Sequence, residues 1–356
     1  KGGKTMFERI FKLSEHKTTV KTEVMAGITT FMTMAYILAV NPSVLGSTGM
    51  DTTAVLLATA LASCLGTLCM AFMANLPFAL SAGMGLNAFM AYTVVAGYGY
   101  SWQVALLAVF IEGLIFIVLS LTNVREAIFN AIPLTLKKGV SVGIGLFIAF
   151  IGLQNSGLCV DSATLVGIIS FPENFHTAGI CALLTLIGLF FTAVFYTRKM
   201  KGAILYGILL TWILGMLCQV TGLYVPTPDA GFYSLFPSWG MTDFSKLGLT
   251  FGQCFNVDFS AVGIVNFIVV IFSFLFVDIF DTLGTLIGVA TKAKMLDKDG
   301  KLPGIKPALL ADSIATSAGA ILGTSTTTTF VESASGVAVG GRTGLTALVT
   351  GILFLV

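Results

Sequence analysis

The chain is poor in charge. Asp, Glu, Lys and Arg make up only 10% of its 356 residues, and the formal net charge is +2. A balance this close to neutral, without a patch of basic and aromatic residues, argues against a nucleic-acid partner. The six cysteines lack paired metal-ligand spacing and fall mostly in apolar segments, so we interpret them as packing residues rather than disulfides or metal ligands.

Apolar residues dominate instead. They make up 56% of the chain, and the mean hydropathy is +0.95, which is typical of a polytopic membrane protein. Apolar runs recur at about the 20 residues needed to cross a bilayer. We predict eleven spans, the tenth of them weak, at about 24–40, 54–73, 79–95, 103–121, 138–153, 177–195, 202–222, 261–290, 308–323, 326–340 and from 343 onward.

The ends of the chain indicate a longer protein, and its basic residues indicate its orientation in the membrane. It opens on Lys1 and stops at Val356 inside an apolar run, so we expect a longer protein with further spans. With these spans, every Lys and Arg except Lys246 falls on one side of the membrane. The positive-inside rule makes that side, and the N-terminus, cytoplasmic. Residues 1–23 contain an amphipathic segment that suits this interface.

Two carboxylates one helical turn apart mark the eighth span. Asp278 and Asp281 lie within the apolar run 276–285. A charge at bilayer depth costs about 2.5–3.5 kcal/mol on insertion scales, so a carboxylate there is by default a candidate functional group. Their spacing puts both side chains on one helix face. We expect that face to line a cavity.

Segment 75–89 does not read as an unbroken span. Pro77 removes a backbone donor, and Gly83 and Gly85 weaken a helix. Irregular backbone at membrane depth persists only where protein or a cavity satisfies it. We therefore expect an extended piece followed by a half-helix whose N-terminus faces the cavity. Asn87 near that start would contact a heterocyclic ring or, alternatively, hold two helices together.

A second broken segment lies at 323–336. Its run of Thr residues favours an extended piece, and Glu332 stands at the start of the following half-helix. Residues 56–58, 62 and 66 recur at 309–311, 315 and 319, an offset of 253 residues. Seven crossings separate the copies, so they have opposite topology. Inverted repeats with paired broken helices are typical of secondary transporters.

Other polar residues keep two interpretations. Thr30, with its neighbours Thr29, Thr33 and Tyr36, either lines the cavity or bonds its own helix. Glu112 in the fourth span is either a proton-coupling group or a structural hydrogen-bond partner. The stretch 223–260 is predicted to be an external lid or interface element. We expect no metal in the solvated turn 292–306.

Three segments resemble the signature segments of the AzgA-like adenine/guanine/hypoxanthine permeases, within the xanthine/uracil permease superfamily. They are residues 83–89, residues 280–285, and residues 323–329 with 331–333. The resemblance implies two inverted seven-span repeats divided into core and gate domains, and proton symport of purine bases at the plasma membrane. It assigns Asp278 and Glu332 to the base, Asn87 to the third span's polar position, and Asp281 to the companion acid.

The resemblance also gives an expected domain plan. Repeat one contributes core residues 24–122 and gate residues 138–222, the external loop is 223–260, and residues 261–356 form an incomplete repeat-two core. About three further spans would follow. A homodimer is compatible with this plan, and neither cofactor nor enzymatic activity is expected.

Chemistry supports a purine as the substrate. Carboxylates accept hydrogen bonds from ring N–H groups, and the flat faces of the base suit Phe31, Phe89 or Phe330. Asp281 is the candidate proton carrier, with a share for Glu112 left open. No Arg or Lys cluster at membrane depth would hold a phosphate. An anion transporter or channel of the same architecture is the alternative. An intramembrane aspartyl protease needs two Asp residues in the membrane. Here the Gly83-Met84-Gly85 turn is followed by Leu86-Asn87 and offers no second Asp, which argues against that function.

Overall fold

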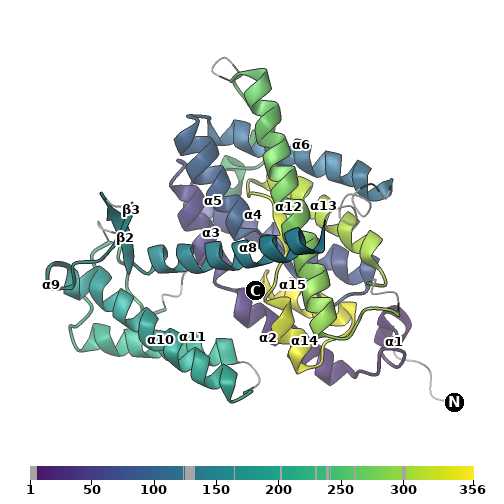
Figure 1. The fold of residues 1–356 in the computed structure, drawn as a ribbon, viewed down its shortest axis with the longest axis horizontal. Coiled ribbons are helices and arrows are strands. Elements are labelled where there is room, and N and C mark those ends of the chain that lie inside the picture. Colours follow the sequence, from purple (N-terminus) through teal and green to yellow (C-terminus); the bar gives the residue numbers. More distant parts are fainter. Residues whose placement is uncertain are drawn as a thin grey trace. The chain divides into compact units, whose positions relative to one another are not determined.

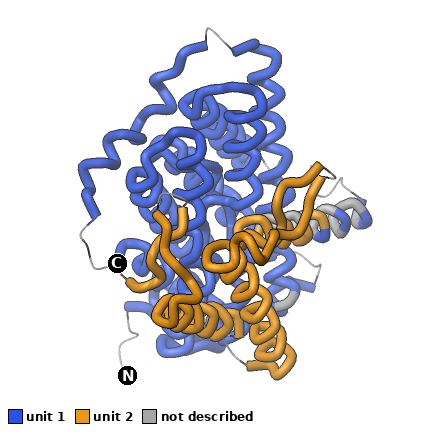
Figure 2. The backbone as a smooth tube through the Cα atoms, turned by 90° about the vertical axis from the view of Figure 1, so that its left-hand side faces the viewer, with its two compact units in different colours: residues 1–142, 242–356 blue, residues 143–241 orange. Residues whose placement is uncertain are grey.

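The structure is a computed structural model that describes residues 6–122, 124, 133–163, 165–200, 203–228, 231–237, 240, 242–259, 262–298 and 302–356. The chain forms two compact units, which Figure 2 distinguishes by colour. Unit 1 consists of residues 1–142 and 242–356, and unit 2 consists of residues 143–241.

Unit 1 carries most of the helices, and Figure 1 shows their order along the chain. Its first part holds α1 (Met6–Phe11), α2 (Val20–Met34), α3 (Ile37–Gly46), α4 (Thr52–Cys69), β1 (Leu80–Ala82), α5 (Met84–Ala88) and α6 (Trp102–Leu121). Its second part holds α12 (Ile264–Lys292), α13 (Ile305–Leu322), β4 (Thr327–Thr329), α14 (Ser333–Val339) and α15 (Gly344–Leu353). Single π-helical stretches extend α4 through Ala74 and α5 through Gly97.

Unit 2 is a smaller helical body. Helix α8 (Leu134–Asn155) enters it, followed by the hairpin of β2 (Cys159–Ser162) and β3 (Leu165–Ile168). Helices α9 (Phe171–Asn174), α10 (Ile180–Thr197) and α11 (Ala203–Val220) complete the unit. The contact between α10 and α11 is close and reciprocal: Thr192 of α10 fills the space beside Gly207 of α11, and Thr211 of α11 fills the space beside Gly188 of α10.

Among the described residues, six helical stretches are long and apolar enough to cross a membrane. They are Val20–Gly46, Thr52–Ala74, Trp102–Leu121, Phe171–Thr197, Ile264–Thr291 and Ile305–Leu322. The sequence-based prediction of a multi-pass membrane protein is thereby confirmed. Shorter apolar helices occur at Met84–Gly97, Tyr206–Val220 and Gly344–Leu353, where the third, seventh and eleventh spans are expected.

The two broken segments meet as a buried antiparallel ribbon. Leu80, Ser81 and Ala82 of β1 pair with Thr329, Thr328 and Thr327 of β4, and all six residues are buried. Beyond the ends of the strands, the Gly83 N–H donates to the Thr326 oxygen and the Phe330 N–H to the Ala79 oxygen, each at 2.9 Å. Each broken segment thus satisfies the other's backbone at depth, where water cannot. The extended piece expected in each segment is present.

Small residues let α13 pack tightly against α4 and α6. A Cβ added at Gly66 would lie 2.6 Å from the Ala315 Cβ, and one at Gly113 would lie 2.8 Å from the Ser317 backbone nitrogen. Such close approach lets polar residues of α13 reach the ribbon: the Thr316 hydroxyl donates to the Thr327 carbonyl oxygen at 2.9 Å. Helix packing through small residues is typical of membrane interiors.

The stretch expected to be an external lid packs, in part, onto unit 1. Short 3₁₀ helices at Phe244–Leu249 and Gln253–Phe255 contact α4 and α6. The Gly252 N–H donates to the Ile321 oxygen at 2.7 Å and the Thr250 hydroxyl to the Leu322 oxygen at 2.9 Å, which caps the C-terminus of α13. Residues 229–230, 238–239, 241 and 260 of the predicted lid lie outside the described residues.

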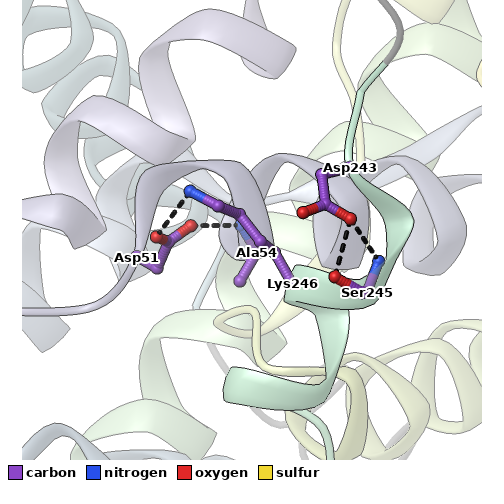
Figure 3. A network of polar contacts seen from close by, with 5 residues as sticks. All are labelled: Asp51, Ala54, Asp243, Ser245 and Lys246. Atoms are coloured by element: carbon purple, nitrogen blue, oxygen red, sulfur yellow. Dashed lines mark hydrogen bonds and ion pairs between the residues drawn. The ribbon is translucent and has the colours of Figure 1, made fainter.

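Two aspartates hold this stretch in place (Figure 3). Asp51 caps α4 by accepting from the Ala54 N–H at 2.9 Å, and it pairs with Lys246 at 3.2 Å. The backbone donor and the lysine together lower the pKa of Asp51. Asp243 accepts from the Ser245 N–H and hydroxyl, which lowers its pKa. The Asp51–Lys246 ion pair therefore fastens residues 243–246 to the start of α4, and Asp243 fixes the turn within that stretch.

Candidate functional site

The candidate site lies around the ribbon of β1 and β4. Helix α5 begins directly after β1, and α14 begins shortly after β4. Because the strands are antiparallel, the two short helices leave opposite ends of the ribbon. Asn87 lies on α5, and Glu332 is the N-cap residue of α14. The two broken segments therefore place an amide and a carboxylate on either side of one buried ribbon.

Three further carboxylates surround this ribbon. Asp278 and Asp281 lie on α12, and Asp312 lies on α13. Asp278 and Asp312 are fully buried, whereas Asp281 is partly exposed, as is Glu332. Asp281 lies close enough to Asp312 and Glu332 to interact with both electrostatically. A Cβ added at Gly83 would lie 3.6 Å from the Asp281 Oδ2, which places this acid beside the start of α5.

Asp312 was not predicted from the sequence. It lies within α13 in an apolar run that was assigned as a span, so the rule that directed attention to Asp278 and Asp281 applied equally to it. Its oxygens lie 3.0 and 3.1 Å from the Thr282 hydroxyl, and Thr329 donates to it at 3.5 Å. An acidic residue in an apolar span was the signal that could have found it.

Helix α2 and the turn after it form a polar wall against α14. Tyr36 donates its phenol O–H to the Glu332 Oε1 at 2.7 Å, and Thr33 bonds Ser335 at 2.8 Å. Thr33 also donates toward carbonyls of its own helix, as does Thr29, which is one of the two interpretations given to these hydroxyls. The Thr30 hydroxyl faces Gly336 and has no hydrogen-bond partner within the described part of the chain.

Asn87 and Glu112 both bond the segment that enters β4. The Asn87 Oδ1 accepts from the Ser325 hydroxyl, and its Nδ2 has no partner among the residues that the structure describes. The Glu112 Oε2 accepts from the Thr326 hydroxyl at 2.9 Å. A buried amide donor without a partner is costly unless a ligand satisfies it. Asn87 therefore has spare donor capacity, and Glu112 has the structural bond that was one of its two interpretations.

The three predicted aromatic residues divide between two clusters: Phe89 packs in one, and Phe31 and Phe330 pack in the other. Phe89 packs edge-on against Phe274 at a centroid distance of 4.9 Å. Phe330 is buried in another cluster with Met34 and Ile37, and Phe31 packs edge-on against Phe354 at 5.2 Å. Phe330 immediately follows β4, and its N–H is part of the ribbon's hydrogen bonding. The structure does not bring Phe89 and Phe330 together.

The chemistry of the site is that of hydrogen-bond acceptors. Neither Asp281 nor Glu332 takes part in an ion pair within the described ranges, and their recorded partners are hydroxyl and carboxyl groups. Carboxylates and hydroxyls suit a neutral ligand with N–H donors, and the Asn87 amide can both donate and accept. A phosphate or sulfate would meet negative charge here.

Comparisons with known proteins identify relatives of the whole chain. A putative permease MJ0326 of Methanocaldococcus jannaschii is 47% identical over 98% of this chain and 75% of its own length. The guanine/hypoxanthine permease PbuG of Bacillus subtilis is 46% identical, covering 97% and 76%, and the adenine permease AdeP of Escherichia coli is 43% identical, covering 99% and 74%.

A solved structure shows a similar fold. The transmembrane domain of a cyanobacterium bicarbonate transporter, BicA, matches with a TM-score of 0.60 at 16% identity, over 94% of this chain and 80% of that one. Identity this low supports the fold alone. Residues 21–356 match the permease family Xan_ur_permease. From the family match and these identities, the chain belongs to the Xan_ur_permease family of membrane permeases.

Proposed function

We propose that this protein is a secondary active transporter that imports purine nucleobases together with protons by alternating access. Four curated relatives at 41–46% identity are named adenine or guanine/hypoxanthine permeases. The observation that carries the proposal is the placement of Asp281, Glu332 and Asn87 around one buried ribbon formed by two broken segments. This arrangement offers acceptors and a spare amide donor to a flat heterocycle.

In this proposal, carboxylates hold the polar edge of the base. Glu332 and Asp281 are the partly exposed acids, so they are the ones an entering ligand meets first. Each can accept a ring N–H in a charge-assisted bond. The unpartnered Asn87 Nδ2 supplies a donor for a ring nitrogen or carbonyl. Phe330, Phe89 and Thr30 remain proposed contacts.

We assign the coupling role among the acids on their burial. The sequence suggested Asp278 for the base and Asp281 for the proton, with the reverse left open. Asp278 is fully buried and accepts from Thr282 at 3.0 Å, whereas Asp281 is partly exposed. A ligand reaches the exposed acid more readily, which favours the reverse assignment. Glu112 already accepts from Thr326, so it is the weaker coupling candidate.

The inverted seven-plus-seven repeat is part of the proposal. The copies related by the 253-residue offset form α4 and α13, and each copy leads into a strand of the same antiparallel ribbon. The fold shared with BicA supports a transporter architecture. Unit 1 would be the core domain, and unit 2 would be the described part of the gate domain, with a cytoplasmic N-terminus at the plasma membrane.

The second candidate is an anion transporter, which the likeness to BicA favours. The two candidates separate in one experiment. We expect the purified protein to bind adenine, guanine or hypoxanthine and to concentrate that base in proteoliposomes only under an imposed proton gradient. Bicarbonate should neither compete nor accumulate. Accumulation of bicarbonate without any binding of a purine would overturn the proposal.

A further inference from the structure

A single hydroxyl group joins two buried carboxylates. The Thr282 Oγ1 lies 3.0 Å from the Asp278 Oδ1, 3.0 and 3.1 Å from the two Asp312 oxygens, and 2.7 Å from the Thr328 Oγ1. All four residues are buried, with exposed fractions of 0 to 1%. We call Asp278, Thr282, Asp312 and Thr328 the Thr282 cluster. It joins α12, α13 and β4 at one atom.

The number of hydrogens that the Thr282 cluster can donate determines how its contacts are satisfied. A hydroxyl has one hydrogen to donate and two lone pairs, whereas an ionised carboxylate only accepts. If both carboxylates are ionised, Thr282 can donate to one of them, and the other carboxylate oxygen faces it with no hydrogen between. If one carboxyl carries a proton, Thr282 accepts from that group and from Thr328, and donates to the remaining carboxylate. One proton on the pair therefore satisfies all three contacts.

Burial strengthens this argument. Two ionised carboxylates in contact with one hydroxyl, both removed from water, carry a large desolvation cost and repel each other. The proton belongs to the pair rather than to either residue, as in other tightly coupled acids.

We propose that Asp278 and Asp312 act as one proton-holding pair around the Thr282 hydroxyl, and that the proton transported with the base resides on this pair. This rests on the proposed function, because it takes proton symport as given and names the groups that hold the proton. Loading forms one O–H bond on a carboxylate oxygen from a proton supplied by water on one side. Release breaks that bond and returns the proton to water on the other side.

The cluster is connected to the base site through β4. Thr328 pairs with Ser81 in the ribbon, and the segments flanking that ribbon hold Asn87 and Glu332. A change in which group donates to Thr282 therefore changes the bonding of Thr328. Other titratable groups face the pair or its neighbours: Asp281 interacts with Asp312, Glu332 and Tyr36 interact with Asp281, and Glu112 bonds Thr326 just before β4.

The test measures protons taken up when a base binds. Purified protein is titrated with its preferred base in weakly buffered solution with a pH dye, and uphill accumulation is measured in proteoliposomes. Wild type should take up about one proton per base, because binding of the two is reciprocal. Thr282→Val removes the hydroxyl at nearly constant volume. We expect proton uptake to fall at least threefold and accumulation to be lost, with base affinity changed less than tenfold.

Three further variants complete the test. Thr282→Ser keeps the hydroxyl and should restore proton uptake. Asp312→Asn donates to Thr282 without binding a proton, so base binding should lose its pH dependence. Thr291→Val is the matched control, because that exposed Thr on the same helix bonds only its own Ile287 carbonyl oxygen, and it should behave as wild type.

The outcomes separate the two proposals. If wild type couples base and proton but Thr282→Val and Asp312→Asn both keep full proton uptake, the proton is held elsewhere and this inference is wrong. Should Thr282→Val fail to fold, the pH profile of Asp312→Asn decides: base binding that keeps the pH dependence of wild type would overturn this inference. If wild type binds no purine, or accumulates it without a proton gradient, the proposed function fails instead.

Discussion

Unit 1 buries carboxylates in two different ways. Glu23 on α2 is fully buried and accepts from the backbone N–H groups of Arg342 at 2.9 Å and of Thr343 and Thr346 at 3.2 Å, and from the Thr346 hydroxyl at 2.6 Å. In the Thr282 cluster, two carboxylates lie within hydrogen-bonding distance of one hydroxyl. Both sites bury carboxylates, but the hydrogen-bond donors around those carboxylates differ.

The difference lies in how many hydrogens the partners supply. The donors around Glu23 are mainly fixed N–H groups at the start of α15, a position where a helix favours negative charge. They satisfy an ionised carboxylate without any added proton. In the Thr282 cluster the shared donor is one rotatable hydroxyl, whose single hydrogen can serve only one of the two acids at a time. Burial alone therefore does not mark an acid as functional; the identity of its donors does.

The comparison predicts its largest effect on stability at Glu23. Glu23→Ala removes the acceptor of the Arg342 and Thr343 N–H groups and leaves the Thr346 N–H only its bond to the Thr343 oxygen, so we expect the free energy of unfolding to fall by about 3 kcal/mol. Thermal unfolding in detergent measures this. Glu15→Ala, which removes an exposed acid paired with Lys12, is the control and should change stability by less than about 0.5 kcal/mol. A Glu23 variant as stable as wild type would show that the donors around Glu23 do not need its carboxylate.

At Glu332 we expect a large effect on purine binding and a small effect on stability. Glu332→Gln keeps the shape and removes the charge, so we expect purine binding to weaken by about 10- to 100-fold, the value of a charge-assisted hydrogen bond of about 1.5–3 kcal/mol. Its midpoint of thermal unfolding should stay near that of wild type, because Tyr36 can still donate to the amide oxygen. Equilibrium binding of radiolabelled base is the measurement. Unchanged affinity would remove Glu332 from the site.

Asn87 is expected to affect the specificity for the base. Its Nδ2 has no partner within the described residues, so Asn87→Ala deletes a donor aimed at ligand rather than at protein. We expect the ranking among adenine, guanine and hypoxanthine to change by several-fold, equivalent to about 1 kcal/mol, with transport still dependent on the proton gradient. Competition binding with the three bases measures it. An equal loss for all three would indicate a packing role.

The smallest effect is expected at the surface acid Asp51. Its lowered pKa, caused by the Ala54 N–H and by Lys246, means that it stabilises the fold at neutral pH, above its ordinary pKa. That contribution is lost as the pH falls through the lowered pKa. Lys246→Ala should cost only about 0.2–1 kcal/mol, because the pair is partly exposed. Thermal unfolding across the acidic range checks both, and a larger cost would mean that residues 243–246 brace α4.

Local pattern was enough to predict the long apolar helices and the two interruptions. Hydropathy located the long apolar helices, and Pro77 with the Thr run before Glu332 indicated where helices give way to extended backbone. These features depend on neighbouring residues, because a missing N–H or a β-branched run acts within its own turn of chain. The acids Asp278, Asp281 and Glu332 were visible for the same reason.

The pairing of those acids was decided by tertiary structure. Asp278 and Asp281 look alike in the sequence, yet one bonds Thr282 in the dry interior and the other is partly exposed beside Gly83. Asp312 joins them from α13, and Glu23 meets donors about 320 residues away. The sequence by itself determined where charge is buried; only the folded chain decided which donors meet it, because a carboxylate's chemistry is set by the atoms packed around it.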